Sequence, residues 1–290
     1  MVYEQARRHG TTKKRFLDVG IILRNFLACN RTCRLAATGR IACIIGFMII
    51  LSVGMPRAGS GWYYNLTNDM MLAAGAQDAR QIRGRFHLQR VLTEVNCNIG
   101  TLCAARLSAV MIPSLLGNSF VIKAHGAPSS TAMRLIQAGQ IRSTYIYRDP
   151  RDAMLSAMEN GRRAIERNRP NAFSPYVEFA NALDFIEEYL HIGQKWMDVK
   201  QALTVRYENL LINYDLETNR LAAFLELDPQ QEKMRAVIER YRPEKAQQET
   251  KGIHFSHGRI GRFRQKMDHD QQQAMLDRLS PYLTRLGYAL

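Results

Sequence analysis

Cysteine is scarce in this sequence and is not arranged in close pairs. The 290 residues include five cysteines, an odd number, and no two of them form a CxxC pair. Structural zinc sites and redox motifs use such pairs, and disulfide-stabilised secreted domains carry an even, dense set of cysteines. We therefore expect reduced thiols in a cytoplasmic protein that binds no metal.

The sequence also lacks a hydrophobic run of membrane-spanning length. Residues 41–55 carry no charge, but this stretch has only 15 residues, and a spanning helix needs about 20. We do not expect a signal peptide, because the basic segment before this stretch is too long and no clear cleavage site follows it. Since a glycine-rich loop begins at once, we interpret residues 47–53 as a buried parallel strand.

Acidic residues are in the minority, and the basic residues are unevenly placed. The chain has 40 Lys and Arg against 26 Asp and Glu, a formal net charge of +14. Residues 1–40 hold nine basic and two acidic residues, a net charge of +7 and half of the total. We expect a basic extension over residues 1–40 and one folded domain over residues 41–290. The charge favours an anionic partner: nucleic acid, a membrane surface, or a phosphate- or sulfate-bearing ligand.

Short apolar, β-branched segments alternate with helical patterns along the chain. Strands are expected at residues 48–53, 120–123, 144–147 and 203–206, and helices at 62–74, 130–138, 150–167 and 175–199. Such alternation predicts an α/β fold, a three-layer sandwich with a central parallel sheet flanked by helices. Ligands of such sheets bind outside the carboxyl ends of the strands, so the residues just after each strand are the candidates for a site.

The loop after the first strand has the composition of an anion-binding turn. It reads Gly54-Met-Pro-Arg-Ala-Gly-Ser-Gly-Trp62 and opens a helix. Gly54 and Gly59 have the spacing of a nucleotide-binding P-loop, but Ser60 and Gly61 replace its Lys-Ser/Thr pair. The missing lysine and magnesium-binding hydroxyl disfavour an ordinary kinase or ATPase. The backbone N–H groups, with Arg57, still favour an anion at this helix N-terminus.

Two other strand ends carry chemically useful side chains. Arg148 follows the strand at 141–147, and Ser156 lies two turns along the next helix, where its side chain points back toward the helix N-terminus. Both side chains are therefore able to contact one phosphate. Lys123 and His125 are two residues apart at another strand end and face the same side of an extended chain. A histidine there is suited to act as a general base near neutral pH.

Taken in order, these segments resemble the motifs of sulfotransferases that use 3′-phosphoadenosine 5′-phosphosulfate (PAPS). Residues 56–62 resemble the loop that binds the 5′-phosphosulfate, although Gly61 stands where a hydroxyl residue is usual. Residues 123–128 are similar to the family's Lys-Thr-His-x-x-Pro, and residues 147–156 to its 3′-phosphate motif, Tyr-Arg-x-Pro-x-Asp-x-x-x-Ser. The resemblance covers residues 47–290 and implies a sulfotransferase domain with a P-loop nucleotide-hydrolase-like fold.

A last basic loop extends the resemblance with several departures. Residues 254–263 resemble the Arg-Lys-Gly-x-x-Gly-x-Trp segment that closes over the 3′-phosphate, and both glycines keep their spacing. Ser256 and His257 stand where Arg and Lys are usual. Compensation by Arg259 or by Arg262 remains open.

The resemblance implies transfer of a sulfuryl group from PAPS to an acceptor hydroxyl or amine by in-line attack, which leaves adenosine 3′,5′-bisphosphate and needs no metal. His125 would take the acceptor proton, while Lys123 and Arg57 would stabilise charge on the leaving phosphate. Tyr207, in a segment similar to the family's Arg-Tyr-Glu-Asp/Asn-Leu, would lie beside the adenine. The residues assigned in this way to the donor are Arg57, Ala58, Gly59, Ser60, Gly61, Trp62, Arg148, Ser156, Tyr207, His257, Gly258 and Arg259.

Several alternatives stay open at this point. A P-loop kinase or another nucleotide-binding protein would share the fold, and a non-enzymatic basic protein would bind nucleic acid or membrane with strong salt dependence. With the family motifs we expect no nucleic-acid partner. The acceptor, whether a small molecule, a glycan or a lipid, is not readable from residues 75–118 and 159–180, which we expect to shape its pocket. The extension over residues 1–40 is either a membrane-surface or partner-binding segment or lies before a true start at Met48.

Overall fold

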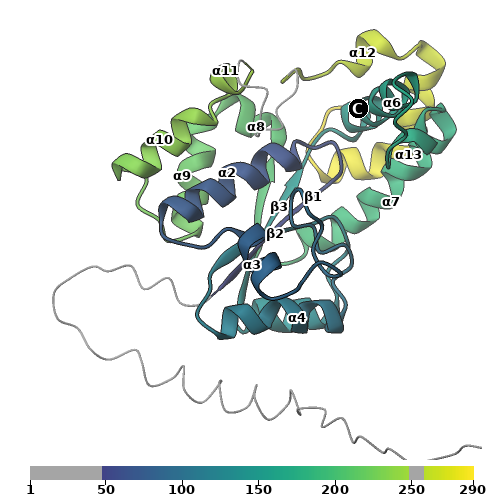
Figure 1. The fold of residues 1–290 in the computed structure, drawn as a ribbon. Helices are drawn as coiled ribbons and strands as arrows, with labels where there is room; N and C mark the ends of the chain where they lie inside the picture. The colour runs from purple at the N-terminus through teal and green to yellow at the C-terminus, as the bar shows by residue number, and fades with distance from the viewer. Residues whose placement is uncertain (1–47, 248–257) are drawn as a thin grey trace, which may run out of the picture. The chain divides into compact units, whose positions relative to one another are not determined.

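The structure, a computed structural model, describes residues 48–247 and 258–290. The basic extension predicted over residues 1–40, with the membrane contact expected of it, lies outside the described residues. Figure 1 shows the described part as a central sheet with helices packed against it.

The four predicted strands form one parallel sheet in the order β2-β1-β3-β4. They are β1 (Ile49–Gly54), β2 (Phe120–Ala124), β3 (Ile141–Tyr147) and β4 (Leu203–Arg206). All six residues of β1 are buried, so the interpretation of the apolar run as a buried strand is confirmed for the described residues. No helix in residues 48–247 or 258–290 is long and apolar enough to cross a membrane.

The helices cover both faces of this sheet. Their bounds are α2 (Ser60–Ala73), α3 (Ala79–Arg85), α4 (Ala104–Leu115), α5 (Ser130–Gln137), α6 (Pro150–Glu166), α7 (Phe179–Met197), α8 (Tyr207–Ile212), α9 (Tyr214–Phe224), α10 (Glu232–Arg240), α11 (Pro243–Ala246), α12 (Phe263–Lys266) and α13 (His269–Arg285). The predicted single helix at 175–199 is wrong at its start. Residues Ser174–Tyr176 form a separate 3-10 turn, and α7 begins only at Phe179 because Glu178 before it is extended.

Alternate residues along the strands divide the core into two layers, as the period of two in a strand requires. Ile50 and Val121 pack with α2, α9 and α10 on one face. Leu51 and Ile122 pack on the other face with α3, α4, α5 and Trp196 of α7. The predicted three-layer α/β sandwich is therefore confirmed.

The connections around β1 place an opening at one edge of the sheet. Helix α2 follows β1 and packs on one face, whereas α5 follows the neighbouring strand β2 and packs on the other face. Two adjacent strands whose following helices diverge leave a crevice outside their carboxyl ends, which is the usual ligand site of such sheets. The outer edge of β2 is covered, because Ile99 N donates to Lys123 O (2.9 Å) and Lys123 N donates to Cys97 O (3.2 Å).

The loop between α6 and α7 packs closely on α6 at Gly161. A Cβ at Gly161 would lie 2.3 Å from the carbonyl oxygen of Phe173, which is a backbone atom without freedom to move. We expect Gly161→Ala to destabilise the protein by about 1–3 kcal/mol, because the overlap outweighs alanine's better helix propensity. Urea unfolding measures the change.

Gly84→Ala is the matched control for this substitution. Gly84 also lies in a helix, and nothing lies within 4 Å of the place that a Cβ would occupy there. The control variant should gain about 0.5–1 kcal/mol from helix propensity. Equal effects of the two substitutions would contradict the close packing of this loop on α6.

Candidate functional site

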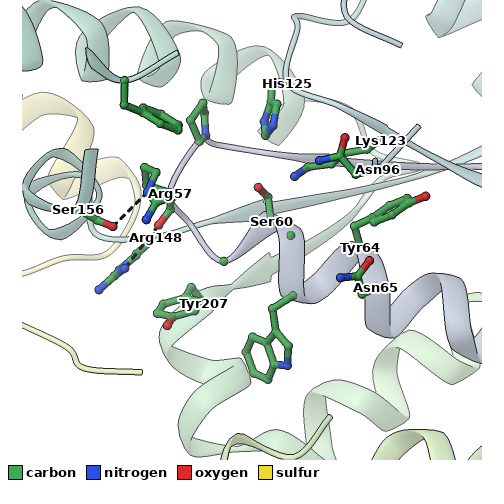
Figure 2. Close-up of a pocket in the computed structure, with 15 residues that line it drawn as sticks. Arg57, Ser60, Tyr64, Asn65, Asn96, Lys123, His125, Arg148, Ser156 and Tyr207 are labelled. Atoms are coloured by element: carbon green, nitrogen blue, oxygen red, sulfur yellow. Dashed lines mark hydrogen bonds between the residues drawn. The ribbon is translucent and has the colours of Figure 1, made fainter. Parts of the chain in front are cut away.

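A cavity of about 300 Å³ opens at the carboxyl ends of β1, β2 and β3. Figure 2 shows its side chains converging from the loop after β1, from β2 and from α6. Most of the site residues predicted from the sequence line it, namely Arg57, Gly59, Ser60, Gly61, Trp62, Lys123, His125, Arg148, Ser156 and Tyr207. Ala58 of the loop after β1 is fully buried and does not line the cavity, and His257 lies outside the described residues.

Two glycines let the loop after β1 pass between its neighbours. A Cβ at Gly54 would lie 2.6 Å from Ile146 Cγ2, and a Cβ at Gly59 would lie 2.6 Å from the ring of Tyr207. Gly59 also has a positive φ of 75° and caps α2, which begins at Ser60. The first N–H groups of a helix have no acceptor within it, so this N-terminus offers donors and a positive dipole end to the cavity.

Three cations, Arg57, Lys123 and Arg148, surround the same space. None of the described residues that line the cavity is an aspartate or a glutamate. Burial and the nearby Arg57 lower the pKa of Lys123 to about 8. Burial, then Arg163 and Arg148, lower the pKa of Arg57 to about 10. Like charges therefore face one another across a buried space, which is the electrostatic signature of a site for a strongly anionic ligand.

Arg148 is held in place but keeps one donor free. Its Nη2 donates to the carbonyl of Arg259 (2.8 Å) and to Asp152 Oδ2 (3.3 Å), and its guanidinium lies 4.6 Å from the ring centre of Tyr207. Its Nε is buried and has no hydrogen-bond partner among the described residues. An unpaired buried donor is costly, so the other contacts of Arg148 have to hold the guanidinium in this position.

Ser156 and Arg57 approach Arg148 from two other directions. The Nε of Arg57 donates to Ser156 Oγ over 3.1 Å, as Figure 2 shows, and Arg57 also lies 5.2 Å from the ring centre of Phe173. The predicted convergence of Arg148 and Ser156 on one cavity is therefore present. Asp149 caps α6 by accepting from Arg151 N, with Pro150 in the first turn.

Asp152 of α6 holds the basic loop before α12 against this helix by two hydrogen bonds. One of its oxygens accepts from Gly261 N (2.7 Å), and the other accepts from Phe263 N (3.1 Å). Arg262 forms an ion pair with Glu159 at 2.5 Å. Arg259 contributes its carbonyl to Arg148, and its exposed side chain is not among the described lining residues. Ligand binding by Gly258 and Arg259 stays a prediction.

His125 is poised as a neutral base. Its Nδ1 lies 2.6 Å from the carbonyl oxygen of Gly54, and because a carbonyl only accepts, Nδ1 carries the proton and Nε2 keeps its lone pair. Burial, reinforced by Lys123, lowers the pKa of His125 to about 4, although the bond to Gly54 acts in the opposite direction. The imidazole is therefore neutral at neutral pH, with its one proton on Nδ1.

Several lining residues were missed from the sequence. Asn65 lies four residues after Gly61, and this helical spacing was a usable signal because it places both on one face of α2. Asn65 is only 7% exposed inside this helix. Asn96 and Phe173 come from irregular segments whose positions depend on contacts with β2 and α6. No local sequence pattern indicates that these two residues line the cavity.

The chain is similar to sulfotransferases both in sequence and in fold. The family model described as sulfotransferase domain matches residues 49–285. The structure of retinol dehydratase in complex with androsterone and the inactive cofactor PAP is similar, with 17% identity, a TM-score of 0.54, and coverage of 82% of this chain and 81% of that chain. Mouse sulfotransferase SULT7A1 complexed with PAP has 13% identity, a TM-score of 0.53, and coverage of 82% and 85%. No curated protein matches the chain.

The low pKa of His125 has a measurable consequence. Its ring signals in NMR should titrate with a midpoint of about 4 and should be missing in His125→Asn. The unfolded chain takes up this proton near pH 6.5. Between these two values the unfolded state binds more protons, so the free energy of unfolding should rise with pH in this window, and His125→Asn should flatten the rise. A midpoint near 6.5 in the folded protein would contradict the burial of a neutral ring.

Proposed function

Since the chain belongs to the sulfotransferase-domain family, we propose that this enzyme transfers a sulfuryl group from PAPS to an acceptor hydroxyl or amine. The observation that carries the proposal is the cavity in which a helix N-terminus and three cations converge beside the neutral base His125. Structures of similar fold hold PAP, which is adenosine 3′,5′-bisphosphate and the expected product.

The residues of the cavity fit such a donor. The N–H groups at the start of α2 and the side chain of Arg57 suit its 5′-phosphosulfate. Arg148, which lines the cavity close to the N-terminus of α6, suits the 3′-phosphate. Tyr207, packed against Gly59 and under the guanidinium of Arg148, suits the adenine side. When bound, PAPS supplies the activated sulfuryl group and leaves as the bisphosphate.

His125 removes the proton of the acceptor in this proposal. Its Nε2 accepts that proton while Nδ1–H stays bonded to Gly54, which fixes the orientation of the ring. Lys123 and Arg57 both line the cavity and carry the positive charge that stabilises the negative charge developing as the sulfur–oxygen bond to the phosphate breaks. Positioning and electrostatics then account for most of the rate enhancement, as in phosphoryl transfer.

We further propose a small-molecule acceptor. The similar retinol dehydratase structures contain androsterone or retinol together with PAP. In this chain Phe173 adds an aromatic wall to the cavity beside Arg57. Incubation with labelled PAPS and a panel of phenols, sterols, glycans and lipids, followed by mass spectrometry, tests both the reaction and the acceptor class. Transfer only to glycans would overturn the small-molecule proposal.

Binding measurements separate this function from that of a P-loop kinase. The protein should bind adenosine 3′,5′-bisphosphate more tightly than ATP with magnesium, because the lysine of a Walker motif is replaced by Ser60. A preference for ATP with magnesium would overturn the proposed donor.

His125→Asn should lower the transfer rate by about 100- to 10,000-fold, the usual contribution of a general base. Asparagine retains a donor for the Gly54 carbonyl, so the dissociation constant of adenosine 3′,5′-bisphosphate should change little. Steady-state kinetics and calorimetry measure the two effects. Near-normal turnover would refute the role of His125.

Arg148→Ala should weaken binding of adenosine 3′,5′-bisphosphate by about 10- to 100-fold, since charge-assisted hydrogen bonds to a phosphate are lost. Adenosine 5′-phosphate, which has no 3′-phosphate, should bind nearly as before. Arg134→Ala is the control, because this arginine lies on α5 and donates only to the Ser130 carbonyl within the described contacts. An unchanged preference for the bisphosphate in Arg148→Ala would refute its 3′-phosphate role.

A further inference from the structure

The residues that follow α13 contact the two turns that carry Arg148 and Tyr207. We call residues 287–289 the tail segment. The OH of Tyr288 donates to Glu208 Oε2 over 2.7 Å, and the carbonyl of Ala289 accepts from Arg151 Nη2 over 2.8 Å. Figure 1 shows the end of the chain beside α6, which agrees with the second contact. The tail segment thus connects elements that are far apart in the sequence.

One of these turns leads from β4 into α8 and carries Tyr207. Arg206 lies 3.9 Å from the ring centre of Tyr288 and donates to the Gly287 carbonyl, while Glu208 accepts from the Tyr288 hydroxyl. Both residues that flank Tyr207 are therefore held by the tail segment. Tyr207 itself faces the other way, against Gly59 and Arg148 of the cavity.

The other turn leads from β3 into α6 and carries Arg148. Asp149 N donates to Glu208 Oε1 over 3.0 Å, so the two oxygens of one carboxylate join this turn to the tail segment. Asp149 also pairs with Arg151 at 2.9 Å, and Arg151 reaches the Ala289 carbonyl. The residues after Arg148 are thus fixed from two sides.

Glu208 depends on these partners because it is only 5% exposed. A buried carboxylate is stable only when its oxygens accept hydrogen bonds or face a cation. Burial and the nearby Glu208 raise the pKa of Tyr288 well above its ordinary value, so its hydroxyl remains a donor. Arg206 Nε is 3.5 Å from Glu208, which is too long to replace the Tyr288 hydrogen bond.

We propose that Tyr288 is a positioning residue that acts through Glu208 to hold Arg148, with the Tyr207 ring packed against its guanidinium, in the geometry that recognises the 3′-phosphate of the nucleotide. Tyr288 does not line the cavity, and its effect passes through the backbone of the two turns. The proposal rests on the function proposed above for Arg148. It goes beyond that function because it assigns nucleotide selectivity to a residue outside the binding site.

Tyr288→Phe tests the proposal with little disturbance of the fold, because the phenylalanine ring keeps the contacts with Arg206 and Tyr147. We expect its dissociation constant for adenosine 3′,5′-bisphosphate to rise by about five- to tenfold. The constant for adenosine 5′-phosphate should change less than about twofold, since that ligand offers no 3′-phosphate to Arg148. Calorimetry on the full chain measures both.

Tyr282→Phe is the matched control. Tyr282 is also a buried tyrosine near the end of α13, but its hydroxyl contacts His191 of α7 and no residue of either turn. Removing the Tyr282 hydroxyl should leave the preference for the bisphosphate unchanged. This should hold even if thermal unfolding shows that Tyr282→Phe and Tyr288→Phe lose the same amount of stability. A parallel loss of preference in both variants would show a general structural effect and overturn the proposal.

A double-mutant cycle with Arg148→Ala isolates the coupling. Tyr288→Phe should weaken bisphosphate binding in the wild-type background and have no further effect once Arg148 is alanine. A full effect in the Arg148→Ala background would overturn the positioning role. If the wild-type protein does not prefer the bisphosphate over adenosine 5′-phosphate, the proposed function of Arg148 fails and the inference fails with it. If it does, and Tyr288→Phe keeps that preference, only the inference fails.

Discussion

The mutual repulsion of buried cations is the constraint on which this site depends. Arg57 and Lys123 line one cavity with Arg148, and each of the first two has a lowered pKa because of burial and a neighbouring positive charge. Arg148 pairs with Asp152, whereas Arg57 and Lys123 form no ion pair within the described part of the chain. The fold has to hold these groups together until an anion compensates them, which destabilises the ligand-free state and strengthens anion binding.

Close backbone packing makes this arrangement sterically feasible. Gly54 lets β1 pass against Ile146, and Gly59 lets the ring of Tyr207 lie against the loop. The ring then supports the guanidinium of Arg148 from below. A loop of larger residues would move the start of α2 away from Arg148, and the helix dipole and the cations would no longer face the same space. Packing and electrostatics are therefore coupled at these two glycines.

Local patterns in the sequence predicted most of the fold. Short apolar, β-branched segments followed by polar loops are recognisable as strands, and all four strands lie within a few residues of their predicted bounds. The helix predicted from residue 175 failed at its start, because an extended Glu178 interrupts a sequence whose apolar pattern is continuous. Periodicity records which residues are buried and does not record a short break in the backbone.

The sequence by itself determined which residues end the strands and which chemistry they bring, because motif spacing along a strand or helix converts directly into a shared face. This spacing was enough to predict four site residues, His125, Lys123, Arg148 and Ser156. Only the tertiary structure decided the neutral state of His125, the pairing of Arg57 with Ser156, and the presence of Asn96 and Phe173 in the cavity. Each depends on burial or on a contact between segments far apart in the chain, and no local pattern specifies either.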